Sequence, residues 1–305
     1  MANTIFRPAD LEQLLQNTII EQLPERMFSN GSIIQTTPVA LGARIVTQPK
    51  ANVYGRAAFV TWGNTQDIPA VDVFIEEVSI PIHPLKIKYG VTEDEILSAD
   101  FAGVDVKSPR VEAAVQALFD RIDDVGYIGN TSLGMFGIAN QPNSTIITLP
   151  AVGTGSTTTF STKTAQQIAD DLFALATEAG RLSRNAYKTP IILLPVAQYY
   201  TCLRKRSTGT GEKTALALYF EAIMALYGEK AKVYPCPYLD TAGVGGVPIA
   251  IAMTDDSQKI GYVRYPGIKN SPVELYQGNM EGRMSMYLSG VFATAQIGVT
   301  RCIGI

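Results

Sequence analysis

The chain of 305 residues is poor in charge: Asp, Glu, Lys and Arg make up 17% of it, and its formal net charge at pH 7 is −3. Soluble domains average about 25% charged residues, so the chain is predicted either to be very compact or to have much of its surface covered by other proteins. The near balance of acids and bases excludes an ordinary basic nucleic-acid binder, and no apolar run reaches the ~18–20 residues that would span a membrane.

The N-terminal region predicts one short helix and no targeting segment. The helix is expected from Pro8 to Glu25, with leucine and isoleucine side chains along one side. No uninterrupted apolar stretch follows a basic start, so no secretory signal is predicted. The cysteines Cys202, Cys236 and Cys302 have no C-x-x-C spacing, and they are expected to be reduced thiols rather than a disulfide framework.

The pattern from Ser32 to Lys88 is typical of β structure. Segments rich in β-branched and aromatic residues predict strands at Ala43–Val46, Ala57–Trp62, Val71–Ile80 and Leu85–Tyr89. The polar residues 63–67 separate the second of these strands from the third, which indicates a long two-stranded hairpin. A hairpin of this kind is marginally stable alone and needs a surface to lie on.

Two helices with clear start signals follow. Thr92-Glu-Asp-Glu95 is a capping box, and it predicts a short helix that ends at about Asp100. Ser108-Pro109 begins a longer helix, because serine favours the N-cap and proline the first helical position. Apolar residues then recur at helical spacing as far as Val125, which predicts one buried stripe.

The rest of the chain alternates between helix and strand and then returns to β structure. A loop rich in Gly, Ser and Thr is expected at 150–162. Helices are predicted at Thr164–Arg184, Val196–Arg204 and Lys213–Tyr227, a buried strand at Thr189–Leu194, and further strands at Ala231–Tyr234 and Val247–Met253. From Val273 onward the pattern is again that of strands.

Catalytic motifs are sparse. His83 is the one histidine, so any histidine-dependent mechanism would need it, and we expect it to be a satisfied residue of a β segment. The Ser207–Thr214 loop resembles a phosphate-binding loop, but Glu212 stands before Lys213 where that motif requires glycine. Asp240-Thr-Ala-Gly243 lacks the glycine that directly follows threonine in aspartic proteases. We therefore expect no catalytic, cofactor-binding or metal-binding residue, and no cofactor.

Three motifs lie between Ala43 and Pro142. They read Asp67-Ile-Pro-Ala-Val-Asp72-Val, Tyr89-Gly-Val-Thr-Glu-Asp-Glu-Ile96, and Gly126-Tyr-Ile-Gly-Asn130 followed by Gly134-Met-Phe-Gly137-Ile-Ala-Asn140-Gln-Pro142. Together with the order of the predicted elements, they resemble the major capsid proteins of tailed double-stranded DNA phages. Beyond residue 150 the resemblance rests on the order of the elements.

The resemblance implies an α+β fold, the tailed-phage major capsid fold that encapsulins share, and it divides the chain into four parts. These parts are an N-terminal arm (1–42), an extended β-hairpin loop with its base (43–88), a peripheral domain (89–142 and 263–305) that contains a spine helix at 108–125, and an axial α/β domain (143–262).

The implied function is structural rather than enzymatic. The chain is expected to self-assemble into pentamers and hexamers of an icosahedral head that encloses double-stranded DNA. Expected partners are further copies of the chain, a portal, decoration or scaffolding proteins, and packaged DNA in a non-specific contact, with no membrane. The protein is expected in the virion, after synthesis in the host cytoplasm. Two alternatives stay open: an encapsulin-like compartment, and an α/β enzyme or ligand-binding protein with its pocket in 143–262.

Contacts between subunits are expected from large side chains on the arm and on the thin hairpin, where no core can bury them. The expected contact residues are Phe6, Leu11, Tyr54, Arg56, Phe59, Trp62 and Phe74. Packing of these side chains within the hairpin, or onto their own domain, is the alternative.

Overall fold

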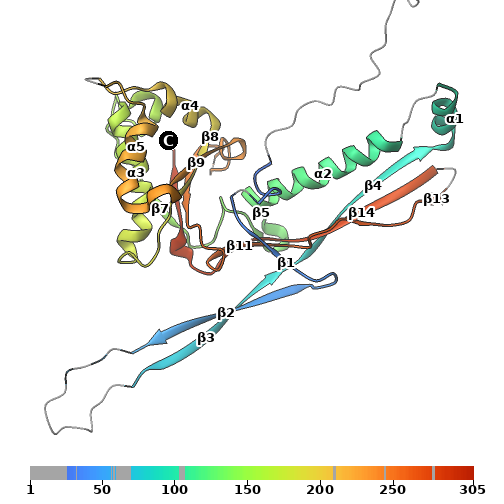
Figure 1. The fold of residues 1–305 in the computed structure, drawn as a ribbon, viewed down its shortest axis with the longest axis horizontal. Helices are drawn as coiled ribbons and strands as arrows, with labels where there is room; N and C mark the ends of the chain where they lie inside the picture. The colour runs from blue at the N-terminus through green and yellow to red at the C-terminus, as the bar shows by residue number, and fades with distance from the viewer. Residues whose placement is uncertain are drawn as a thin grey trace, which may run out of the picture.

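The computed structural model describes residues 26–31, 33–55, 57, 59, 70–102, 107–208, 211–243, 245–276 and 279–305. It confirms the predicted α+β class. Figure 1 shows a helix-rich part built on one sheet, an elongated part built on a second sheet, and a thin pair of strands that projects away from both. The predicted helix at Pro8–Glu25 lies outside the described residues.

The elongated part is organised around the long strand β14 (Asn279–Ala293), which pairs along most of its length with β4 (His83–Thr92). Strand β11 (Ile260–Arg264) and three short strands complete this larger sheet. The short strands are β1 (Thr36–Pro38), β12 (Lys269–Asn270) and β13 (Glu274–Tyr276). The sequence predicted a return to β only from Val273, so β11 and β12 were missed.

Helix α2 (Lys107–Tyr127) lies along one face of the larger sheet, as Figure 1 shows. Its buried residues Ala114 and Leu118 pack against Met284 of β14, and this contact confirms the predicted apolar stripe. Helix α1 (Glu93–Ala102) starts directly after β4. The predicted capping box is confirmed, because the N–H of Glu95 donates to Thr92 Oγ1 and the N–H of Thr92 donates to a Glu95 carboxylate oxygen.

The helix-rich part contains the smaller sheet, whose central strands β8 (Ile191–Pro195) and β10 (Ile249–Met253) are buried along their whole length. The other strands are β7 (Thr145–Ile147), β9 (Lys232–Cys236) and β15 (Val299–Ile303), and the helices are α3 (Ala165–Leu182), α4 (Val196–Arg204) and α5 (Ala215–Tyr227). The predicted helices and strands of this region are confirmed to within a few residues at their ends.

Short elements complete the described structure. They are β5 (Gly129–Asn130), β6 (Met135–Phe136), and the single 3-10 turns η2 (Thr131–Leu133), η3 (Phe160–Thr162), η4 (Gly228–Lys230), η5 (Pro237–Leu239) and η6 (Gln296–Gly298). The glycines near β5 and β6 are required by close packing. A Cβ on Gly126 would lie 2.5 Å from the Phe28 ring, and one on Gly137 would lie 2.5 Å from the Gly129 nitrogen.

The C-terminal strand lies in a different place from the one that the resemblance implies. Residues 263–305 were expected in the peripheral domain, yet β15 is hydrogen-bonded to β10 of the smaller sheet, from Val299 opposite Met253 to Ile303 opposite Ile249. Strand β10 is apolar on both faces and buried, so both of its edges need hydrogen-bonding partners. β8 and β15 supply them.

The described residues from 26 to 38 were expected in the N-terminal arm, but they lie against the body of the molecule. Met27, Phe28, Ile33 and Ile34 are buried in the cluster that joins the two parts of the molecule. Strand β1 follows and pairs in parallel with β11. The apolar side chains of this segment explain the difference, because they gain more from burial than from exposure on an arm.

Candidate functional site

The thin projecting element, called the ribbon here, consists of β2 (Ile45–Tyr54) and β3 (Asp72–Pro81). They pair antiparallel from Ile45 opposite Pro81 to Tyr54 opposite Asp72. The predicted hairpin therefore exists, but its first strand was predicted wrongly as Ala57–Trp62. Ala57 and Phe59 lie in no strand, and the polar tip at 63–67 lies outside the described residues.

The ribbon packs against the body at its base. There Val46, Val78 and Ile80 pack against Val263 and Phe292 of the larger sheet. Further out, the side chains of β3 from Asp72 to Glu77 are all exposed. A pair of strands without a third strand or a helix beneath it has no core of its own, so the outer ribbon depends on another surface for burial.

Both faces of the outer ribbon present apolar side chains. On one face Val53 lies opposite Val73, next to Ile75, and these residues are 68%, 53% and 62% exposed. On the other face lie Tyr54 and Phe74, which are 61% and 60% exposed. Residues opposite each other in a strand pair share a face. Exposed apolar side chains therefore stand on both faces of the ribbon.

The structure places three of the predicted contact residues. Tyr54, Phe59 and Phe74 are exposed, and none of them packs into a buried cluster. Phe6, Leu11, Arg56 and Trp62 lie outside the described residues.

The aliphatic face of the ribbon was missed. Its signal in the sequence is the recurrence of Val71, Val73 and Ile75 at every second position, which is the spacing of one strand face.

The start of the described chain is held by helix α2. The buried carboxylate of Asp123 accepts hydrogen bonds from the backbone N–H groups of Met27, at 2.9 Å, and Ser29, at 2.8 Å. Arg26 forms an ion pair with Asp120 at 2.8 Å. Burial raises the pKa of Asp123, and the donated N–H groups oppose this shift. The segment that follows residue 25 is therefore fixed at a defined point of the body.

Further apolar side chains are exposed at two other places. On α1, Leu97 and Phe101 lie one turn apart at the free end of the larger sheet. On the helix-rich part, Tyr200 of α4 and Met224 and Leu226 of α5 are exposed. Exposed apolar groups that lie together mark sites of interaction with other proteins, so the pair on α1 is a further candidate for contact.

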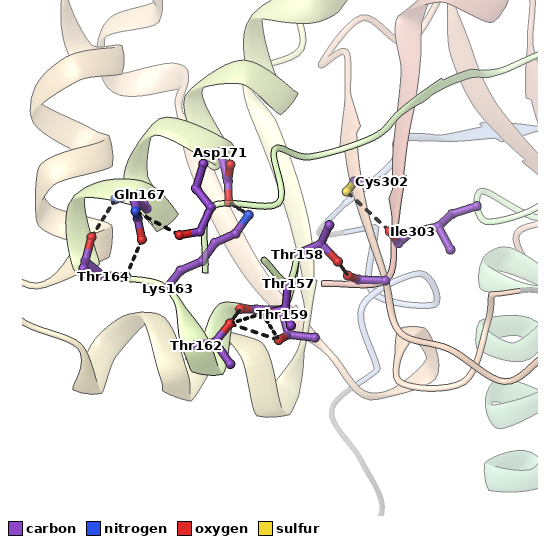
Figure 2. Close-up of polar contacts among 12 residues, drawn as sticks. Thr157, Thr158, Thr159, Thr162, Lys163, Thr164, Gln167, Asp171, Cys302 and Ile303 are labelled. Atoms are coloured by element: carbon purple, nitrogen blue, oxygen red, sulfur yellow. Dashed lines mark hydrogen bonds and ion pairs between the residues drawn. The ribbon is translucent and has the colours of Figure 1, made fainter. Parts of the chain in front are cut away.

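Figure 2 shows the polar contacts that hold the loop before α3 to the rest of the helix-rich part. Lys163 and Asp171 form a buried ion pair at 2.6 Å. Thr164 caps α3 through a reciprocal contact with Gln167. The hydroxyl of Thr158 donates to the carbonyl of Gly304 at 2.6 Å, which ties the loop to the end of β15. These groups are engaged with one another, so they support the fold.

The residues that could have carried chemistry have structural partners. His83 Nε2 lies 3.1 Å from the carbonyl of Leu133, as expected of a satisfied histidine. At the end of the 207–214 loop, Thr214 caps α5 by accepting a hydrogen bond from the N–H of Ala217. Lys213 forms an ion pair with Glu221.

The cysteines are buried, and burial raises the pKa of Cys202 and of Cys302 to about 12. Their thiols are therefore protonated at neutral pH. Within the described part of the chain, no group of three or more His, Cys, Asp and Glu residues is placed to hold a metal ion. None of the described helices has the length and apolar character needed to cross a membrane.

Comparison by sequence matches residues 55–273 to the family described as major capsid proteins. A search of curated proteins finds no match. Among solved structures, the capsid of Myoviridae phage XM1 is similar over 100% of both chains, with 18% identity and a TM-score of 0.82.

Two more distant structures share the fold. A structure from Mycobacterium phage Ogopogo aligns over 97% of each chain with 11% identity and a TM-score of 0.61. A virus-like particle from Pyrococcus furiosus aligns over 88% of this chain and 90% of its own, with 12% identity and a TM-score of 0.56.

Proposed function

The chain belongs to the family of major capsid proteins, and from this premise we propose that its copies assemble into pentamers and hexamers of an icosahedral phage head that encloses double-stranded DNA. The family and the fold are those of structural capsid proteins. In this role the protein resides in the virion shell after synthesis in the host cytoplasm, and it acts through its surfaces.

The observation that carries the proposal is the ribbon, which exposes apolar side chains on both faces and has no core beyond its base. Burying one valine or isoleucine side chain contributes about 1.5–3 kcal/mol. Exposed strand edges also offer unpaired N–H and C=O groups to another chain. Both features are liabilities in an isolated subunit and become contacts when the ribbon lies on a neighbouring copy.

The contact between copies is heterologous, because the ribbon of one subunit meets a different surface of the next. Such contacts close into rings when the rotation between subunits allows it. In this arrangement the ribbon residues Tyr54, Arg56, Phe59, Trp62 and Phe74 lie between subunits. Phe6 and Leu11 make further contacts from the arm.

The four parts of the chain keep their proposed roles with two changes of boundary. The axial domain includes β15 in addition to residues 143–262, because β15 completes its sheet. The arm ends before Arg26, because residues 26–38 belong to the core. The portal, scaffolding or decoration proteins, and a salt-sensitive contact with packaged DNA are the proposed further partners.

A protein compartment without DNA is the second candidate function, and it is favoured by the fold similarity to the Pyrococcus furiosus virus-like particle. The contents of purified particles separate the two. Double-stranded DNA protected from nuclease supports the phage head, whereas particles from infected cells that hold protein and no DNA support the compartment.

The proposal is tested by deleting Val53–Ala70 from the full-length chain. We expect the variant to remain soluble, with the circular dichroism and unfolding midpoint of the unassembled wild-type subunit, because the described residues within the deletion join no buried cluster. It should form no closed particles by negative-stain microscopy under conditions in which the wild type does. Intact particles from the deletion variant would falsify the role of the ribbon.

A further inference from the structure

The segment Arg26–Ser29 lies beside the end of α2, at the junction between the elongated part and the helix-rich part (Figure 1, dark blue). On the elongated side, the Phe28 ring meets the ring of Tyr127 edge to face, with their centroids 4.6 Å apart. On the helix-rich side, Met27 Sδ lies 3.9 Å from Cys236 Sγ of β9. The segment therefore contacts both parts at once, and we call it the clamp.

Helix α2 is shaped to receive the clamp. The Phe28 side chain is 1% exposed, and a Cβ on Gly126 would lie 2.5 Å from its ring. Only a residue without a side chain leaves this space, although glycine is a poor helix former. Helix α2 thus carries an intrinsically unfavourable residue at the position that the Phe28 ring covers.

The clamp is held by side chains rather than by strand pairing. Residues 26–31 belong to no strand and no helix. Asp123 of α2 accepts hydrogen bonds from the N–H groups of Met27 and Ser29, and Arg264 of β11 donates to the carbonyl of Ser29 at 3.3 Å. Strand β1 then ties the chain to β11. Withdrawal of the clamp would therefore break no strand pair and no helical turn, and the chain would stay attached at β1.

The two parts are connected by loops. In the described part of the chain the two sheets share no strand, and the chain passes from one to the other through the loops that follow β10 and β14. Next to the clamp, the ring of Tyr127 stacks on that of Tyr238 in η5, with centroids 4.9 Å apart. Loops of this kind permit rotation of one packed body against another, and the side chains between the bodies oppose it.

We propose that the clamp is reversible and that, when seated, it holds the two parts at one relative orientation. With the clamp seated, Met27 and Phe28 fill the junction and the parts lie as in Figure 1. With the clamp withdrawn, both sheets stay intact, the thiol of Cys236 is uncovered, and the parts rotate about the connecting loops. A partner that binds the chain before Arg26 acts on this orientation, because those residues continue directly into the clamp. The device belongs to the single subunit, so it goes beyond the proposed assembly and does not depend on it.

The chain's own cysteines report on the clamp. Cys236 lies against Met27, whereas Cys202 and Cys302 are buried in the separate cluster of the helix-rich part. Pulse labelling of the full-length, unassembled subunit with N-ethylmaleimide, followed by peptide mass spectrometry, gives a rate for each thiol. In Phe28→Ala we expect Cys236 to react about tenfold faster or more, and the other two thiols to stay within about twofold of the wild type, because only the local opening is favoured.

Two further variants separate the clamp from a general loss of packing. Gly126→Ala keeps Phe28 but fills the space under its ring, so it should speed the labelling of Cys236 even though alanine favours the helix. The matched control is Phe160→Ala, which removes an equally buried phenylalanine from the cluster that holds the other two thiols. It should speed the labelling of those two thiols and leave that of Cys236 within about twofold.

The wild-type chain supplies a measurement that needs no substitution in the clamp. Opening of the clamp exposes less surface than unfolding of the subunit, so the labelling rate of Cys236 should rise less steeply with urea than the rates of Cys202 and Cys302. This comparison remains decisive if Phe28→Ala does not fold.

Spin labels measure the orientation itself. Lys269 of the elongated part and Lys230 of the helix-rich part are exposed, and the chain's own cysteines are buried, so labels attach selectively to Lys269→Cys with Lys230→Cys. Electron–electron resonance should give one narrow distribution of distances between the labels. Adding Gly126→Ala should broaden this distribution or add a second maximum.

The outcomes decide each half of the proposal, and none of them depends on whether the chain forms shells. If Phe28→Ala and Gly126→Ala speed all three thiols by the same factor, and the wild type shows one common urea dependence, the segment is an ordinary part of the core and there is no clamp. If Cys236 becomes reactive while the distance distribution stays narrow, the segment covers the thiol without setting the orientation, and the inference is overturned.

Discussion

The carboxylate of Asp123 accepts a hydrogen bond from the backbone N–H of Met27 at 2.9 Å, across 96 residues of sequence. A second oxygen of the same carboxylate accepts from the N–H of Ser29. One buried side chain of helix α2 thus satisfies two backbone donors of a segment that has no regular secondary structure. The contact fixes the first described residues to helix α2.

We expect Asp123→Ala to destabilise the unassembled subunit by about 2–4 kcal/mol, because it leaves two donors in a buried site without an acceptor. Urea unfolding followed by circular dichroism measures the change. Asp124→Ala is the matched control: Asp124 is the next residue, it pairs with exposed Arg121, and its loss should cost no more than about 0.5 kcal/mol. Equal effects of the two substitutions would show that the buried acceptor contributes nothing particular.

The ion pair between Glu95 and Arg110 predicts a pH-dependent stability. Two hydrogen bonds from Arg110, at 2.8 and 3.0 Å, and one from the Thr92 N–H lower the pKa of Glu95 from 4.5 to about 2. A depressed pKa in the folded chain stabilises it above the unfolded value, and this contribution is lost as the pH falls. The difference in stability between the wild type and Glu95→Gln should therefore shrink between about pH 5 and pH 2.

A double-mutant cycle isolates this pair. Glu95→Gln and Arg110→Gln should each remove the pH-dependent part, and the double variant should add little to either, because both substitutions break the same contact. Unfolding midpoints between pH 7 and pH 2 supply the measurement. Additive effects would mean that the two side chains act independently and that the pH dependence has another source.

For the buried ion pair of Lys163 and Asp171 (Figure 2), we predict that removing one partner costs more stability than removing both. Removing one partner leaves an uncompensated charge in the interior, which costs about 3–5 kcal/mol. Asp171→Leu or Lys163→Met alone should therefore lower stability by about that amount. The double variant should be closer to the wild type than either single variant, and chemical unfolding distinguishes the cases. A double variant as unstable as the sum of the two would contradict the assignment.

Much of the fold could be predicted from local signals. Helix α4 has the predicted bounds of Val196–Arg204, and α3 begins after the predicted cap residue Thr164. Helix α2 agrees with the prediction to within two residues at each end. These elements combine periodic apolar residues with recognisable start signals, so the information lies within a few turns of chain.

The errors in strand placement have two physical causes. The described residues of the outer ribbon join no buried cluster, and exposed apolar side chains stand on both of its faces, so no single face carries the pattern of a buried one. Pro49 and Lys50 interrupt the apolar pattern of β2, and the segment after them was predicted as the strand instead. The place of β15 depends on contacts between residues that lie about 50 positions apart, such as Cys302 and Ala250. No local pattern carries that information.

The candidate contact surfaces, like the fold, could be predicted from the sequence only in part. Aromatic residues on a thin hairpin, such as Phe74, indicated contact on composition alone. Lys86 and Lys88 stand two residues apart and share a strand face, but Lys269 and Arg283 join them only through the register of β14. The gathering of these four cations on one sheet face therefore depends on the register of the strands.

The aliphatic face of the ribbon supplies the sharpest separation between folding and assembly. Val73 and Ile75 are exposed in the subunit, so Val73→Asp with Ile75→Asp should change the unfolding free energy of the unassembled chain by less than about 0.5 kcal/mol. In an assembled shell the same carboxylates would be buried without partners, at a cost of several kcal/mol for each charge. Particle formation should therefore be lost while the subunit stays folded. Light scattering reports assembly, and circular dichroism reports folding. The uncharged control, Val73→Thr with Ile75→Thr, introduces hydroxyls without charge and should assemble at a raised protein concentration. If the aspartate variant forms normal shells, the aliphatic face of the ribbon is exposed to solvent in the shell and takes no part in the interface between subunits.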